Sequence, residues 1–125
     1  MATTRGRPDR ETLGLRGEDL AADHLAARGL LVLDRNWRCR EGEIDLVARE
    51  GNALVFCEVK ARRGLGYGHP AEAVTFAKQR RIRVLAQRWL AAHDEHARDV
   101  RFDVVGVLVR RVQPAVVTHL RGAFS

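Results

Sequence analysis

The sequence has few cysteines, no long apolar run and no leader-like start. Its 125 residues include two cysteines, Cys39 and Cys57, and neither belongs to a C-x-x-C pair or to a zinc-type group with histidine. Such cysteines are typical of reduced residues in a cytosolic protein. No run of about 18 apolar residues is present to span a bilayer, and the arginine-containing start lacks an apolar signal core. We therefore expect a cytoplasmic protein without a membrane partner.

Two common motifs are also missing. The glycine-containing segment 61–69 has no G-K-[ST] ending, which excludes a phosphate-binding P-loop there. His93 and His96 flank two acidic residues without the H-E-x-x-H spacing of metalloproteases. These absences exclude a P-loop nucleotide hydrolase and a zinc protease of that type.

Positive charge, by contrast, is abundant. The net charge is +6, with 46% hydrophobic and 30% charged residues. This composition is typical of one globular domain. The excess of basic over acidic residues indicates a polyanionic partner. Charge alone leaves DNA, RNA and an acidic membrane surface open. We expect a flexible basic tail over residues 1–12 and a single domain over residues 13–125.

Hydrophobic periodicity and turn residues predict an α/β fold in the order α-β-β-β-α-β-β. A helix is expected from Leu13, capped by Thr12, to Arg28, and a long helix follows Pro70 with Val74, Ile82, Leu85 and Trp89 on one stripe. The full set of predicted elements is helix 13–28, strands 30–37, 43–49 and 53–60, a loop over 61–69, helix 71–92, and strands 101–109 and 116–120.

Two of these strands form a hairpin that brings two carboxylates together. Gly51 and Asn52 suit a two-residue loop with glycine at its first central position. Counting outward from that loop places Asp45 opposite Glu58, with Cβ atoms roughly 4.5 to 5.5 Å apart. The same count places Ile44 opposite Val59, on the other face of the hairpin.

Two like charges inside an apolar sheet need a counter-charge or a shared proton. A divalent cation meets this need, and carboxylate, carbonyl and water oxygens are the ligands that Mg²⁺ or Mn²⁺ prefers. Lys60 lies on the Glu58 face, about 6.6 Å along the strand. The alternative is a surface hairpin with solvated charges, in which Lys60 pairs with Glu43 opposite it.

Other polar residues have predicted supporting roles. Glu18 adds a third carboxylate on the core side of the first helix. The long helix carries cations suited to phosphate, with a solvated helix face as the alternative. Glu72 and Gln79 could act as outer hydrogen-bonding groups, and Asp103 is expected to orient an arginine or a backbone group. The predicted nucleic-acid-binding residues are Lys78, Gln79, Arg80, Arg81 and Arg83.

The ordered pieces resemble a known superfamily. Gly17-Glu18, Gly42-Glu43-Ile44-Asp45-Leu46 and Glu58-Val59-Lys60 resemble the PD-(D/E)XK nucleases, although Ile44 stands where that superfamily has proline. With Asn36-Trp37-Arg38, residues 70–74, 78–82 and 101–105, the chain resembles the uncharacterised bacterial YraN family, related to archaeal Holliday-junction resolvases. This resemblance implies a restriction-endonuclease-like mixed central sheet flanked by helices. It also implies Asp45 and Glu58 as metal ligands, Lys60 as catalytic lysine and Glu18 as accessory acid.

Together these observations predict a metal-dependent endonuclease-like protein that acts on nucleic-acid phosphodiester bonds. Asp45, Glu58 and the Val59 carbonyl are expected to hold Mg²⁺ or Mn²⁺, and structured or branched DNA is favoured over RNA. Two alternatives remain: a binding module that keeps the nuclease fold without cutting, and an interaction protein whose basic face meets an acidic partner. A homodimer is left open.

Overall fold

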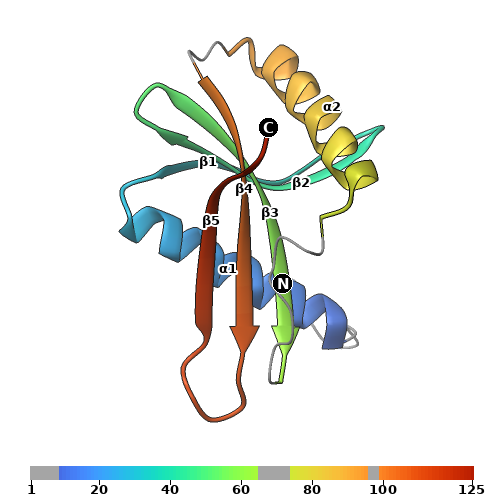
Figure 1. The fold of residues 1–125 in the computed structure, drawn as a ribbon. Helices are drawn as coiled ribbons and strands as arrows, with labels where there is room; N and C mark the ends of the chain where they lie inside the picture. The colour runs from blue at the N-terminus through green and yellow to red at the C-terminus, as the bar shows by residue number, and fades with distance from the viewer. Residues whose placement is uncertain (1–8, 65–73, 96–98) are drawn as a thin grey trace, which may run out of the picture.

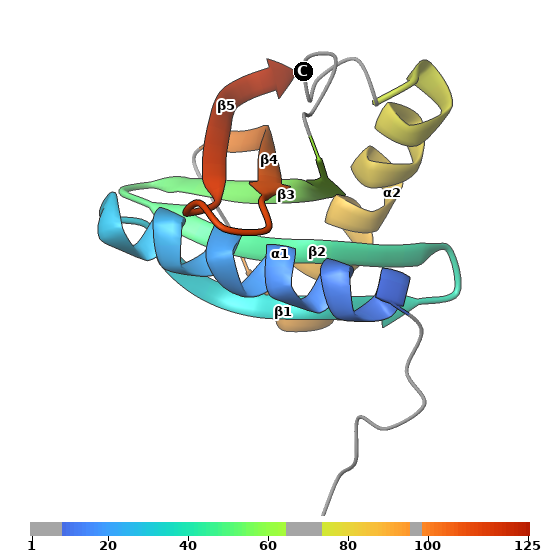
Figure 2. The same ribbon diagram turned by 90° about the horizontal axis from the view of Figure 1, so that it is seen from below.

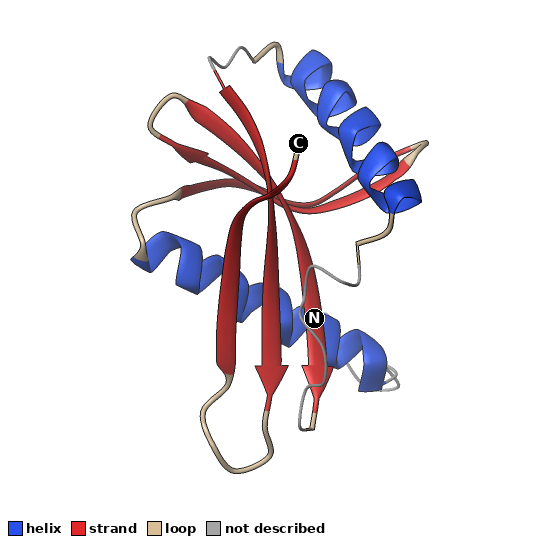
Figure 3. Ribbon diagram, viewed as in Figure 1, coloured by secondary structure: helices blue, strands red, loops and turns tan. Residues whose placement is uncertain are grey.

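The protein is a five-stranded mixed sheet with a helix on each face, described here from a computed structural model over residues 9–64, 74–95 and 99–125 (Figures 1 and 3). The element order confirms the predicted α-β-β-β-α-β-β arrangement. The elements are α1 (Asp9–Ala27), β1 (Leu31–Cys39), β2 (Gly42–Glu50), β3 (Ala53–Arg63), α2 (Phe76–His93), β4 (Asp99–Val109) and β5 (Val116–Phe124).

The strands lie in chain order across the sheet, β1-β2-β3-β4-β5. Neighbouring strands are antiparallel except for β3 and β4, which run parallel. Parallel neighbours need a crossover connection, and the segment containing α2 provides it. As a result β3 lies at the centre of the sheet, with both of its edges paired.

Each helix covers one apolar face (Figure 2). On the α1 face, Leu25 packs with Leu46, Val55 and Val105. The α2 face holds a second cluster that includes Phe56, Trp89 and Val104, and the predicted stripe of Val74, Ile82, Leu85 and Trp89 is buried in it. Burial on both faces explains why the run 54–57 in β3 is apolar without alternation.

The β2–β3 hairpin has the predicted loop and register. Gly51 has a φ of +59°, whereas Asn52 has no positive φ, as expected for a loop with glycine first. Pairing runs from Glu50 and Ala53 to Leu46 and Cys57, which confirms the predicted count over this stretch.

Beyond Leu46 and Cys57 the two strands separate. In Figure 1 the first residues of β2 turn toward α2, while β3 continues alongside β4. The predicted pairing of Ile44 with Val59 is therefore wrong. Ile44 instead pairs with Trp37 of β1 and is buried in the α2-side cluster. The sheet thus forks immediately after the hairpin, at the position of Asp45 and Glu58.

Several predicted boundaries need correction. Helix α1 begins at Asp9, so residues 9–12 are helical, while residues 1–8 of the predicted tail lie outside the described residues. The apolar periodicity begins only at Leu13, so it gave no signal for residues 9–12. Strand β3 continues to Arg63 instead of ending at Lys60, because β4 pairs with it along its whole length.

The start of α2 is also different. The helix begins at Phe76, and Thr75 is its N-cap, with an oxygen that accepts the Lys78 N–H at 3.2 Å. The prediction that the helix follows Pro70 directly was wrong for this reason, and residues 65–73 lie outside the described residues. Threonine is one of the residues that favour the N-cap position, because its hydroxyl can accept a backbone N–H of the first turn. At the end of the chain, β5 extends past Leu120 to Phe124.

Candidate active site at the fork of the sheet

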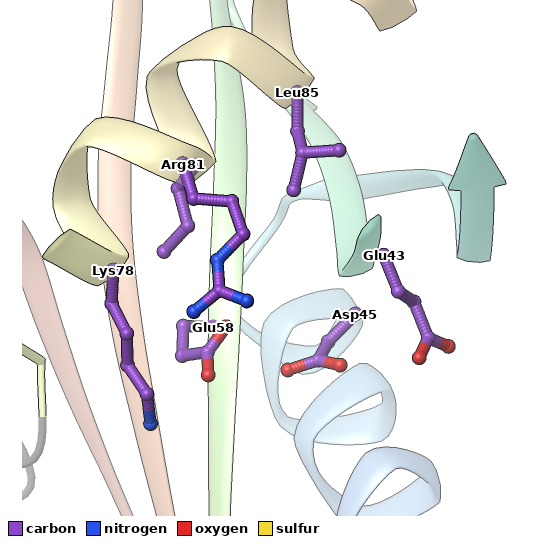
Figure 4. A pocket seen from close by; sticks show the side chains of 7 residues that line it. Glu43, Asp45, Glu58, Lys78, Arg81 and Leu85 are labelled. Carbon is purple, nitrogen blue, oxygen red and sulfur yellow. The ribbon is translucent and has the colours of Figure 1, made fainter. Parts of the chain in front are cut away.

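A pocket of about 260 Å³ lies where β2 and β3 separate, against one side of α2 (Figure 4). The carboxylates come from the two strands, and the cations come from the helix. The lining residues are Glu43, Asp45, Glu58, Lys78, Arg81, Ile82 and Leu85. The fork therefore brings together the two carboxylates that the hairpin count predicted.

Asp45 replaces part of the missing strand pairing. Its Oδ2 accepts the backbone N–H of Val59 at 2.8 Å. The N–H and C=O of one strand residue point to the same edge, so the Val59 carbonyl also faces the gap between the strands. This places the predicted carbonyl ligand on the same edge of β3 as the Asp45 carboxylate.

The two carboxylates resist ionisation. Burial, followed by the charge of Glu58, raises the pKa of Asp45 to about 8, and Glu18 and Glu43 add to the effect, while the Val59 N–H opposes it. Burial also raises the pKa of Glu58, against the opposing charges of Lys78, Arg81 and Lys60. A site of this kind favours binding of a positive charge.

The nearby cations do not already neutralise the pair. In the described part of the chain, Lys60, Lys78 and Arg81 form no ion pair within 4.0 Å of a carboxylate. Glu43 forms an ion pair with Arg38 at 3.6 Å, so the alternative in which Lys60 pairs with Glu43 is wrong. Lys60 is half-buried and close enough to Glu58 to lower its pKa, although it does not line the pocket itself.

Glu18 reaches the site from the helix on the opposite face. Its Oε1 accepts the Asn36 Nδ2–H at 2.8 Å, and its charge raises the pKa of Asp45. Asn36 has a φ of +53°, a conformation that asparagine tolerates better than most residues. Beside Glu18, Gly17 lets α1 approach β3 closely, because a Cβ there would lie 2.5 Å from that of Ala61.

Only some of the predicted nucleic-acid-binding residues on α2 line the pocket. Lys78 and Arg81 point toward the carboxylates (Figure 4). Gln79 donates to the Val74 carbonyl at the start of the helix, and Glu72 lies outside the described residues. Arg80 is exposed.

Arg83 is engaged elsewhere. It donates to the Ser125 carbonyl and lies over the Phe124 ring. Of the predicted set, then, Lys78 and Arg81 are the members that line the pocket.

Asp103 has the predicted orienting role. It is fully buried on β4 and accepts two hydrogen bonds from Arg101, one from His119 and one from the Gly122 N–H. Although burial opposes ionisation, these donors lower the pKa of Asp103 to about 2. Asp103 therefore ties β5 to β4 and does not line the fork pocket.

Two site residues were missed by sequence reasoning. Glu43 lines the pocket, which its two-residue spacing from Asp45 on one strand could have indicated. Asn36, which holds Glu18, has no local signal, because its partner is 18 residues away. No described set of three or more His, Cys, Asp or Glu side chains is grouped to hold a metal ion alone. Neither described helix is long and apolar enough to cross a bilayer.

Comparison with known proteins identifies the family. The model of "Uncharacterised protein family UPF0102" matches residues 17–107, which include Glu18, Asp45, Glu58 and Lys60. The chain belongs to the UPF0102 family. This confirms the predicted YraN-type group, while membership of the nuclease superfamily stays a prediction.

Similar UPF0102 proteins occur in several bacteria. The relative from Rhodococcus opacus (strain B4) is 57% identical over 112 residues, which cover 90% of this chain and 95% of the relative. The relative from Beutenbergia cavernae is 58% identical over 113 residues, covering 90% and 96%. One from Frankia casuarinae is 57% identical over 115 residues, covering 92% and 98%. The names of these relatives state no activity.

Proposed function

We propose that the protein is a cytoplasmic, metal-dependent endonuclease-like enzyme that hydrolyses phosphodiester bonds in structured or branched DNA. The observation that carries this proposal is the half-buried pair Asp45 and Glu58. These carboxylates share a pocket with Lys78 and Arg81, yet no described cation is in ion-pair contact with them. Paired carboxylates beside unpaired cations suit a metal ion and a phosphate together.

The residues at the fork fit Mg²⁺ or Mn²⁺. Mg²⁺ is commonly bound through one or two carboxylates, with waters and substrate phosphates completing its shell, so three protein side chains are not required. Asp45, Glu58 and the Val59 carbonyl would hold it. When bound, the ion lowers the pKa of a coordinated water and neutralises charge on the scissile phosphate.

The protein's own side chains have separate roles around this position. Lys60 orients the attacking water or stabilises negative charge that develops on the phosphate, since its ammonium group lies near Glu58 without an ion-pair partner within 4.0 Å in the described part of the chain. Lys78 and Arg81 hold the phosphate backbone from the helix side. Glu18, fixed by Asn36, acts as an accessory acid next to Asp45.

A second candidate function is a nucleic-acid-binding module that keeps this fold without cutting. The observation in its favour is that Lys78 and Arg81 line the fork pocket, where they can contact phosphate without a metal ion. Such a module would use Lys78 and Arg81 in the same way and would bind DNA equally well without a divalent cation.

A cleavage assay separates the two functions. Duplex, single-stranded, flap and four-way-junction DNA are each incubated with the protein and Mg²⁺ or Mn²⁺, and binding is measured on the same substrates with EDTA. The nuclease proposal predicts metal-dependent cleavage of at least one branched form, lost in Glu58→Gln. Binding to junctions without cleavage in either metal would contradict it and favour the binding module.

A further inference from the structure

The outer face of α2 is exposed and basic. The helix packs on the sheet through one buried stripe, and it contains no acidic residue. On the other side, Phe76, Arg80, Val84 and Gln87 follow one another at spacings of three or four residues, and all four are exposed. Residues at these spacings lie on one side of a helix. The charge that α2 presents to solvent is therefore entirely positive.

Phe76 is the aromatic residue on this face, and it is 80% exposed. Its ring makes no contact with any other ring that the structure describes, whereas Trp89 of the same helix is buried against Phe56. Single apolar residues are common on protein surfaces, so an exposed ring alone indicates little. The neighbours of Phe76 decide what its ring can bind.

Arg80 lies one helical turn after Phe76. It is exposed, and it has no hydrogen bond or ion pair with any residue that the structure describes. Other arginines of α2 are engaged: Arg83 donates to the carbonyl of the C-terminal residue at 2.6 Å, and Arg88 pairs with Glu41 at 3.1 Å. A guanidinium group about 6 Å along the helix axis from an exposed ring can hold the phosphate of a nucleotide whose base stacks on that ring.

Arg81 connects this face with the fork pocket. It is exposed, directly follows Arg80, and lines the pocket together with Glu58 (Figure 4). Ala77, one turn before Arg81 and adjacent to Phe76, is small and exposed, so a bound strand can pass close to the helix. A strand with one phosphate at Arg81 can therefore reach Arg80 and Phe76 along a single surface.

A ring in this position needs an unpaired base. The bases of a duplex are already stacked on one another, so a protein ring stacks on a base only where the strand is single or the base is flipped out. Among DNA structures, a branched molecule with a single-stranded arm offers such a base next to a backbone that the fork can hold.

We propose that the outer face of α2, through Phe76 and Arg80, binds an unpaired nucleotide of the DNA strand whose backbone the fork pocket holds, with the base stacked on the Phe76 ring. The inference rests on the proposed function, because it takes DNA as the occupant of the fork. It adds the part of a branched substrate that the protein selects, a single-stranded arm that crosses α2.

Binding of single-stranded DNA by Phe76→Ala tests the proposal, with a normal and an abasic oligonucleotide of equal length as probes. Binding is measured in EDTA, so it does not depend on cleavage. Phe76→Ala should weaken binding of the normal oligonucleotide roughly 5- to 150-fold, the range for losing one base–aromatic stack. Its binding of the abasic oligonucleotide should stay at the wild-type value, and Phe76→Trp should restore binding of the normal one.

Arg80→Ala tests the phosphate contact separately. This variant should lower the slope of log affinity against log salt by about 0.7, the contribution of one phosphate contact on a single strand. Phe76→Ala should keep the wild-type slope, because it removes no charge. The matched control is Val112→Ala, since Val112 is 90% exposed in the turn after β4 and its truncation should change neither affinity nor slope.

Three results would overturn the inference: a wild type that does not bind single-stranded DNA, an equal loss by Phe76→Ala on both oligonucleotides, or unchanged binding by Phe76→Ala. The last result would favour a protein as the partner of this face. A wild type that shows the predicted pattern but cuts no DNA with Mg²⁺ or Mn²⁺ would remove the nuclease function and leave the Phe76 site standing. Metal-dependent cleavage without an effect of Phe76→Ala on binding would do the reverse.

Discussion

At the scale of single residues, a buried and a half-buried aspartate show which hydrogen-bond donors the fork lacks. Asp103 is surrounded by donors from Arg101, His119 and Gly122, and its pKa falls to about 2. Asp45 is half-buried, with the Val59 N–H as a donor and Glu58 as a neighbour, and its pKa rises to about 8. The surrounding donors stabilise the negative charge of Asp103. The charge of Asp45 lacks comparable donors and is left to be balanced by a bound ligand.

Lys60 gives the sharpest single-residue prediction. Lys60→Met keeps most of the apolar stem and removes the ammonium group. DNA binding should persist, because Lys78 and Arg81 remain at the pocket, while metal-dependent cleavage should fall by about two orders of magnitude or more. That size corresponds to losing one stabiliser of developing charge, worth roughly 2.7 to 4 kcal/mol.

Single-turnover cleavage with saturating enzyme measures this loss, and thermal melts check the fold. Lys78→Met is the matched comparison, because Lys78 lines the pocket from the helix and should act mainly in binding. Cleavage by Lys60→Met at the wild-type rate would exclude a role for Lys60 in the chemical step.

The residues that could be predicted from the sequence are those whose partners are close in the chain. Asp45 and Glu58 were found because a two-residue turn fixes the register of a hairpin by counting. Asn36 could not be found this way, since it meets Glu18 only after α1 and β1 pack together. Ile44 was misplaced because the count assumed that the strands stay paired, and the fork ends that pairing at Leu46.

At the scale of elements, the contact between α1 and β3 sets where Glu18 lies. Gly17→Ala would place a Cβ 2.5 Å from the Cβ of Ala61, and neither atom belongs to a flexible side chain. Helix or strand must then shift, so we expect a loss of about 1 to 3 kcal/mol in the free energy of unfolding. Urea denaturation measures it.

Gly14 in the same helix is the control, because a Cβ there would meet nothing within 4 Å. Gly14→Ala should stabilise by up to about 1 kcal/mol through helix propensity. Adding Ala61→Gly to Gly17→Ala should recover much of the loss. Destabilisation of equal size by both single changes would show that the close contact is not the cause.

The order and type of the elements were predictable, while their ends were less so. Periodicity and turns identified two helices and five strands because apolar faces must point to a core. The extension of β3 to Arg63 depends on β4, whose paired residues lie 46 positions later in the chain, and no local pattern reveals this pairing.

At the scale of the whole molecule, the fork couples stability to pH. The unfolded Asp45 ionises near 3.8 and the folded one near 8, so between these values the native protein keeps a proton that the unfolded chain has lost. Stability of the metal-free protein should therefore fall as pH rises through this window, as far as Asp45 determines it. A divalent cation binds the ionised carboxylates, so it should restore the lost stability. This stabilisation by the cation should increase toward pH 8.

Thermal unfolding at pH 8, with and without Mn²⁺, tests the central claim that the fork is a metal site. The wild type should be stabilised by Mn²⁺, by about 2.7 kcal/mol at a free concentration one hundred times Kd. Asp45→Asn and Glu58→Gln keep the shape of each side chain and remove its charge, so both should melt higher than metal-free wild type and respond little to Mn²⁺. An equal Mn²⁺ shift in the wild type and both variants, or no shift in the wild type, would contradict the account.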